Sequence, residues 1–107
     1  MLKKDERISK RKELEEIKAA GEMISTPLFG LVWKKGKESK MKKFVAIVSK
    51  RISKKAVERN QIRRRLMEAV RKNKGIFPEG FRGIFLVKKN ILGKKSGEIE
   101  ECLKKLF

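Results

Sequence analysis

Three stretches of the chain place apolar residues three and four positions apart, the spacing of one face of a helix. They predict helices over residues 9–20, 54–73 and 96–106. The middle helix would make about five turns, and its buried stripe is Ile62, Leu66, Ala69 and Val70. Gly21 directly follows the first stretch, where a helix C-cap is expected.

Compact runs of strand-forming residues lie between these helices. They predict strands over residues 28–33, 44–48 and 83–87. The last two strands flank the long helix, and since a helical crossover is how parallel strands are joined, we predict that they are parallel neighbours in one sheet. The fold class is therefore α+β, an α/β two-layer sandwich of order α-β-β-(β)-α-β-α, in which the bracketed strand is optional.

The size of the chain favours one domain with one core, covering residues 1–107, with the first seven or so residues flexible. The net charge of the chain then indicates what kind of partner it binds. Thirty-one Lys and Arg stand against 13 Asp and Glu, a net charge of +18. Such an excess indicates a polyanionic partner, with nucleic acid ahead of an acidic membrane surface. The sequence shows neither a membrane-spanning run nor a signal peptide, so we expect a cytoplasmic protein without a membrane partner.

The inventory of reactive side chains argues against a self-contained enzyme. The chain has no histidine, which removes His-based acid–base chemistry, Ser-His and Cys-His pairs and the usual zinc sites. Cys102 is the only cysteine, so no intrachain disulfide can form. Its neighbours Glu100 and Glu101 disfavour a thiolate, and a small packing residue is the simpler interpretation. We expect no catalytic residue and no metal ligand.

Half of the excess charge lies in about a quarter of the chain. Residues 50–74 carry 11 Lys or Arg and two Glu, a net of +9. At about 100° per residue, Asn60, Arg63, Arg64, Met67 and Arg71 share one third of the helix circumference, away from most of the apolar stripe. Adjacent arginines repel one another in an isolated helix, and a polyanion removes that repulsion. This face is predicted to bind RNA, the alternative being a solvated face that only aids solubility.

The segment from Ser49 to Arg64, SKRISKKAVERNQIRR, closely resembles the signature of the bacterial ribonuclease P protein, with its Arg-Asn-x-x-basic-Arg run on a long helix. Weaker similarity extends from about Arg7 to Phe107. The resemblance implies a left-handed β-α-β crossover, as in a domain of a ribosomal protein. It also implies that the catalytic RNA is bound by Lys50, Arg51, Lys54, Lys55, Arg59, Asn60, Arg63 and Arg64.

Members of this family also bind the single-stranded 5′ leader of precursor tRNA, in a cleft between the first helix and the sheet and often through aromatic residues. The resemblance implies a cleft formed by Leu14, Lys18, Phe29 and Trp33. Trp33, at a strand end, is the better candidate for an exposed stacking platform, although a core position is an equal alternative for both aromatics. The chain departs from the family pattern at two places. In the first helix, Leu14 and Lys18 stand in place of aromatic residues. In the long helix, Met67 stands where arginine is common, and Arg65 or Arg71 could make the RNA contact expected of that arginine.

The resemblance implies a holoenzyme subunit that assists endonucleolytic removal of the leader, the tRNA 5′-end maturation step. The RNA would carry out catalysis, with Mg²⁺ held mainly by RNA phosphates. The partners would be ribonuclease P RNA and the precursor tRNA leader. A structural RNA-binding protein, such as a ribosomal protein, is the main alternative. A DNA regulator fits less well because strand-like runs flank the basic helix, and an independent nuclease is the weakest option.

Overall fold

The computed structural model describes residue 8, residues 11–36 and residues 41–106. The expectation of a flexible start concerns residues outside this part of the chain. In chain order the elements are α1 (Arg11–Ala20), β1 (Glu22–Ser25), β2 (Phe29–Lys35), β3 (Lys43–Ile47), α2 (Ala56–Lys72), the 3₁₀ turn η2 (Lys74–Ile76), β4 (Phe81–Val87), the 3₁₀ turn η3 (Lys89–Ile91) and α3 (Ser96–Lys104).

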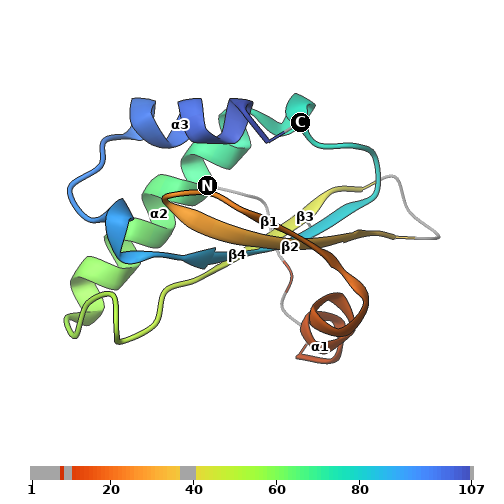
Figure 1. Ribbon diagram of the computed structural model, residues 1–107, viewed down its shortest axis with the longest axis horizontal. Coiled ribbons are helices and arrows are strands. Elements are labelled where there is room, and N and C mark those ends of the chain that lie inside the picture. Colours follow the sequence, from red (N-terminus) through yellow and green to blue (C-terminus); the bar gives the residue numbers. More distant parts are fainter. Residues whose placement is uncertain (1–7, 9–10, 37–40, 107) are drawn as a thin grey trace.

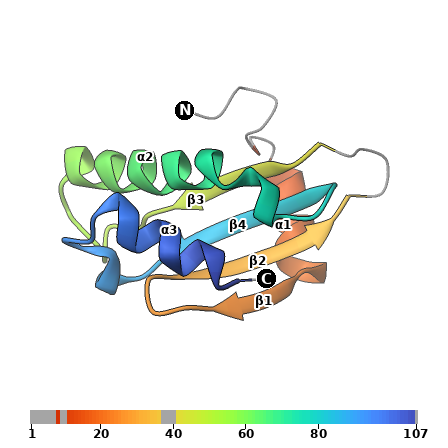
Figure 2. The same ribbon diagram turned by 90° about the horizontal axis from the view of Figure 1, so that it is seen from above.

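The four strands form one sheet in the order β1-β2-β4-β3. Two antiparallel pairings, β1 with β2 and β2 with β4, are followed by a parallel pairing of β3 with β4. The predicted parallel neighbours are confirmed, and α2 is the helix that connects them. Figure 2 shows α2 and α3 side by side above the strands.

The helices are divided between the two faces of the sheet. Figure 1 shows α2 and α3 on one face and α1, seen almost end-on, across the other. The sandwich of sheet, α2 and α3 holds the main core, and α1 packs on β2 and β4 from the opposite side. No helix in the described part of the chain is long and apolar enough to cross a membrane.

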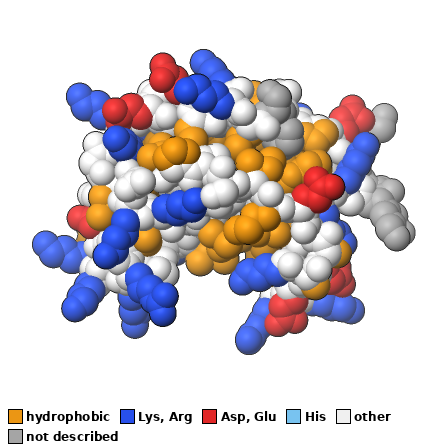
Figure 3. All heavy atoms as spheres, in the orientation of Figure 1, with side chains coloured by type: hydrophobic (Ala, Val, Ile, Leu, Met, Phe, Trp, Pro, Cys, Tyr) orange, Lys and Arg blue, Asp and Glu red, His pale blue; other side chains and the backbone are white. Residues whose placement is uncertain are grey.

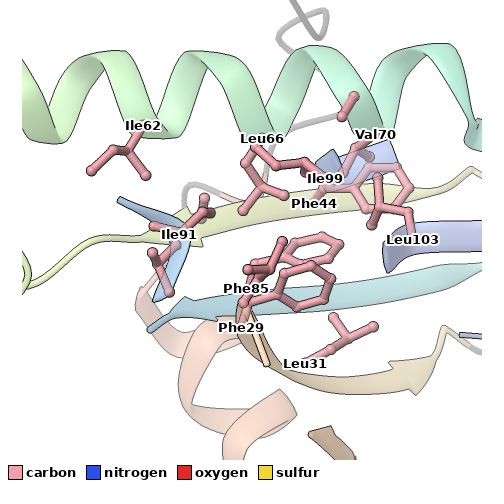
Figure 4. Packing of buried hydrophobic residues seen from close by; sticks show 14 of the residues in the cluster. Phe29, Leu31, Phe44, Ile62, Leu66, Val70, Phe85, Ile91, Ile99 and Leu103 are labelled. Atoms are coloured by element: carbon pink, nitrogen blue, oxygen red, sulfur yellow. The ribbon is translucent and has the colours of Figure 1, made fainter. Parts of the chain in front are cut away.

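Aromatic rings fill the main core (Figure 4). Phe29 and Phe85 meet edge to face with ring centroids 5.1 Å apart, and both side chains are fully buried. The predicted stripe of α2, namely Ile62, Leu66, Ala69 and Val70, covers these rings and is buried as expected. Burial of these aliphatic and aromatic side chains, rather than the helix propensity of an arginine-rich segment, is what holds α2 in place.

A second, smaller cluster lies beneath α1. It contains Ile8, Ile17, Val32 and Ile84, which are all buried. Gly21 ends α1 as predicted, and its N–H donates to the Ile17 carbonyl at 2.7 Å. A Cβ at this position would lie 2.4 Å from that same oxygen, so glycine is required by close approach of the backbone.

The sequence prediction missed one strand and misplaced several element ends by one or two residues, among them the end of α3, which is Lys104 rather than residue 106. β1 was not predicted because its four residues, EMIS, are mostly exposed and it lies at the edge of the sheet. α2 begins at Ala56 rather than at residue 54, and the N–H of its N-cap residue, Lys55, bonds instead to the Ser53 hydroxyl at 3.2 Å. With β1 included, three strands precede α2, in agreement with the α-β-β-(β)-α-β-α order.

Candidate nucleic-acid interface

The connector, residues 49–55, turns sharply before α2 and presents basic side chains on both sides of that turn. The Ile52 N–H donates to the Ser49 carbonyl at 3.1 Å, and the Ile52 side chain packs against the main core. This anchor leaves the basic residues on either side of it exposed, namely Lys50, Arg51, Lys54 and Lys55. The turn therefore fixes where four positive charges are displayed.

The first turns of α2 add further polar and basic side chains beside those of the connector. Asn60, Arg63 and Arg64 are exposed, while Arg59 is half-buried and donates from Nη1 to the Ser53 carbonyl at 2.9 Å. Arg59 thereby ties the helix to the connector. Arg63 donates to the amide oxygen of Asn60, one turn earlier on the helix. We call the eight predicted RNA-contact residues the basic surface, which comprises Lys50, Arg51, Lys54, Lys55, Arg59, Asn60, Arg63 and Arg64.

The structure brings all eight residues together at one end of α2. In Figure 3, Lys and Arg side chains gather at the lower left, where the connector and the start of α2 lie in Figure 1. The described residues gather no three His, Cys, Asp or Glu side chains that could hold a metal ion. The basic surface itself offers guanidinium and ammonium groups, which bind anions, and phosphate is well suited to them.

Two arginines beside the basic surface are engaged within the protein. Arg65 donates from Nη1 to the Lys94 carbonyl at 2.9 Å and so holds the loop before α3. Arg71 bonds to the Glu68 carboxylate, and this guanidinium is the main cause that lowers the pKa of Glu68 to about 2. Met67 packs against the main core. Both arginines therefore already have partners within the chain, and whether either replaces a contact at the position of Met67 stays a prediction.

Val57 is a member of this region that the sequence reasoning missed. Its side chain is 69% exposed although it is apolar and β-branched. On the helix it stands three residues before Asn60 and seven before Arg64, which places it on the same face. An exposed valine among arginines can contact a ribose or a base, and its signal in the sequence was an apolar residue outside the buried stripe.

A second feature lies on the α1 face of the sheet. Leu14, Val45, Ile47 and Leu86 pack against the cluster beneath α1 but remain partly exposed. We call these four residues the apolar groove. In Figure 3 hydrophobic side chains lie below the sheet, between the lobe that contains α1 and the Lys and Arg side chains at the lower left.

The four predicted cleft residues lie on two different faces of the sheet. Leu14 lies at the apolar groove. Lys18 is exposed and, at about 100° per residue from the buried Ile17, points to the same side of α1 as Leu14. Phe29 and Trp33 were wrong as cleft residues, because both side chains project from the other face of the sheet into the main core.

The positions of these two aromatics follow from packing. Phe29 is fully buried against Phe85. Trp33 stacks on Phe81, with ring centroids 5.2 Å apart and ring planes at 20°. Strand alternation correctly put Phe29 and Trp33 on one face and Val32 on the other, but it could not say which face α1 would cover. The structure shows that α1 covers the face of Val32.

Comparison with known proteins gives a consistent result. A family model described as Ribonuclease P matches residues 2–107. The ribonuclease P protein component of Pelotomaculum thermopropionicum is 42% identical over 52 residues, a match that covers 49% of this chain and 46% of that protein. The match therefore spans about half the length of this relative.

Solved structures share the fold. The RNase P protein of Staphylococcus aureus superposes with a TM-score of 0.81 at 22% identity, covering 92% of this chain and 89% of that one. The RNase P protein of Thermotoga maritima superposes with a TM-score of 0.81 at 23% identity, covering 95% of this chain and 98% of that one.

Proposed function

The chain belongs to the ribonuclease P protein family, and we propose that it is the protein subunit of ribonuclease P, binding both the catalytic RNA and the 5′ leader of precursor tRNA. The observation that carries the proposal is the basic surface, which is displayed at one end of α2 by a connector anchored in the core. In this role the protein assists the endonucleolytic removal of the leader.

The basic surface would bind the catalytic RNA through its phosphates. Seven of its eight side chains are exposed, and the eighth, Arg59, fixes the connector. Neutralising phosphates releases counterions, so the affinity would fall steeply with salt. The mutual repulsion of Arg63 and Arg64 would be relieved on binding, and Asn60 can donate and accept at a base edge or a 2′-hydroxyl.

We assign the chemical step to the RNA. When bound, Mg²⁺ held mainly by RNA phosphates would activate the attacking water and stabilise the leaving oxygen. The residues of this chain would contribute positive charge that reduces repulsion between the catalytic RNA and its substrate. A grip on the leader would also favour precursor over mature tRNA.

The apolar groove is the proposed site for the leader. All the described aromatic rings lie in or against the main core, so this groove offers no described ring on which a base could stack. Leucine, valine and isoleucine side chains would instead contact bases without reading their edges. Lys18, exposed on the same side of α1, would contact a leader phosphate.

Reconstitution tests the proposal. The purified protein is mixed with a bacterial ribonuclease P RNA at low Mg²⁺, and 5′ cleavage of precursor tRNA is followed with and without protein. We expect the protein to stimulate cleavage by the RNA and to cleave nothing alone. Tight RNA binding without stimulation would contradict the proposal and favour a structural RNA-binding protein, the alternative that shares this charge and size.

A groove variant tests the site of the leader. Leu86→Ala removes about 40 Å² of contact with a base, or about 1 kcal/mol at ~25 cal/mol per Å², which is roughly a fivefold loss. We expect that loss for precursor tRNA and none for mature tRNA. Leu92→Ala, at an exposed leucine after η3, is the matched control. Equal losses for both tRNAs would place the leader elsewhere.

A further inference from the structure

Three basic side chains lie next to one another across the sheet, outside the basic surface and the apolar groove. The strand register pairs Lys34 of β2 with Arg82 of β4, and Arg82 with Lys43 of β3. Phe44 and Phe81 are buried in the main core, so by alternation Lys43 and Arg82 project from the α1 face. We call Lys34, Arg82 and Lys43 the cation row.

The cation row is electrostatically unfavourable within the protein alone. Neighbouring strands are about 4.8 Å apart, and like charges placed directly opposite one another destabilise a sheet. One ion pair in the described part of the chain touches the row, between Arg82 Nε and Glu13 Oε1 at 3.7 Å. Lys34 and Lys43 make no ion pair or hydrogen bond with the described residues, so within this part of the chain no partner offsets these two positive charges.

Arg82 is held firmly while part of its donor capacity is unused. Its side chain is only 11% exposed, and a Cβ at Gly36 would lie 3.0 Å from Arg82 Nε, so the guanidinium rests against that glycine. Within the described residues, Nη1 is buried and has no hydrogen-bond partner. A buried guanidinium donor without a partner is a costly arrangement, and negative charge placed beside the row would lower the electrostatic part of that cost.

α1 separates the cation row from the apolar groove. Ile17 faces the sheet, and at about 100° per residue Glu13 and Leu14 project to opposite sides of it. Glu13 reaches Arg82, whereas Leu14 lies at the apolar groove. Figures 1 and 2 show α1 running across the strands. In the strand register, Arg82 of the row lies two residues before the buried Ile84.

The cation row is also remote from the basic surface. Lys43 begins β3, and the connector follows the other end of that strand. Six residues of extended chain, from Lys43 to Ser49, span about 20 Å. One patch of positive charge therefore lies at each end of β3, with α1 crossing the sheet between them.

We propose that the cation row binds a phosphodiester group of an RNA strand, at a site separate from the apolar groove and from the basic surface. Phosphate would neutralise Lys34 and Lys43 from the α1 face of the sheet and place negative charge beside the guanidinium of Arg82. The proposal rests on the proposed function in that its ligand is RNA. The phosphate could belong to the catalytic RNA or to the precursor tRNA.

The first test removes the charges of Lys34 and Lys43. The variant Lys34→Ala/Lys43→Ala leaves the Glu13–Arg82 pair intact, and Lys104→Ala/Lys105→Ala removes the same charge from two exposed positions at the end of α3. Affinity for ribonuclease P RNA, precursor tRNA and mature tRNA is measured against salt. One or two lost phosphate contacts should reduce the log–log salt slope by about 0.7–1.8, with no change for the control.

The pattern across the three RNAs identifies the source of the phosphate. A loss with ribonuclease P RNA alone assigns it to the catalytic RNA. A loss with precursor and not mature tRNA assigns it to the leader, and equal losses with both assign it to the body of tRNA. An unchanged slope for all three RNAs, or an equal change in the Lys104→Ala/Lys105→Ala control, would overturn the proposal, whether or not the protein stimulates cleavage.

The second test uses a variant that should raise the stability of the protein while it lowers the affinity for RNA. Lys34→Glu places a carboxylate opposite Arg82, which should raise the Tm by about 1–5 °C because an opposite-charge pair replaces a like-charge pair. The same variant should weaken RNA binding more than Lys34→Ala does. Higher Tm with unchanged RNA affinity would show that the row binds no phosphate, and this outcome does not depend on whether the proposed function holds.

Discussion

Removal of Arg63 and Arg64 by the double substitution R63A/R64A is the sharpest test of the basic surface. Both side chains are exposed on the outer face of α2, and the contact of Arg63 with Asn60 is within the surface itself. The buried stripe beneath them, Ile62 and Leu66, is untouched. We therefore expect the free energy of unfolding to change by no more than about 0.5 kcal/mol.

The magnitude of the binding effect follows from counterion release. Each lost phosphate contact lowers the salt slope by about 0.7–0.9, so two contacts lower it by about 1.4–1.8. Between about 0.05 and 0.2 M salt, a fourfold change, the affinity ratio of wild type to variant should then shrink by roughly tenfold. The variant is weakest relative to wild type at low salt, where phosphate contacts contribute most.

The assay is a filter-binding or fluorescence titration of ribonuclease P RNA at four or more salt concentrations. The variant Lys104→Ala/Lys105→Ala, with the same net charge, separates local contacts from general attraction. A salt slope for R63A/R64A that equals the wild-type slope would refute the assignment of this helix face. So would an equal change in slope for the two double variants.

Three further predictions follow from particular contacts. Phe29→Ala should lower the unfolding free energy, measured in urea, by about 3–5 kcal/mol. In the folded variant, the affinities for precursor and mature tRNA should change equally; a selective loss of precursor binding would return Phe29 to the leader site. Val57→Ser should weaken RNA binding severalfold and leave the urea midpoint nearly unchanged, because its side chain is exposed; unaltered binding would remove Val57 from the interface. Arg65→Ala should lower the unfolding free energy by about 1 kcal/mol through the lost bond to the Lys94 carbonyl, with less effect on the salt slope than Arg64→Ala; the reverse order in salt slope would show that Arg65 turns toward RNA.

Local pattern was enough for most of the elements, and resemblance over one continuous segment was enough to group the residues of the basic surface. The stripe of Ile62, Leu66, Ala69 and Val70 predicted α2 because a helix needs one apolar face, and that face is buried. The eight residues of the basic surface lie within 15 consecutive positions, 50–64. A turn and the start of a helix bring such neighbours together whatever the rest of the chain does.

The face of the sheet on which Phe29 and Trp33 are buried depended on long-range packing. Alternation grouped Phe29 with Trp33, yet both faces of β2 are apolar enough to be covered, since Val32 on the opposite face is also buried. Only the placement of α1 over Val32 and Ile84 decided that Phe29 and Trp33 belong to the main core. A period of two residues defines the two faces of a strand but does not identify the helix that covers each one.

The amino-acid sequence by itself determined most of the element types, the basic segment 50–74 and the family, because each depends on residues close together in the chain. Tertiary structure alone decided which residues form the apolar groove and brought Lys34, Arg82 and Lys43 into one row. These three lysine and arginine side chains are separated by up to 48 positions in the sequence, counted from Lys34 to Arg82. Their proximity arises from strand order and register, which depend on the packing of the whole sheet against its helices.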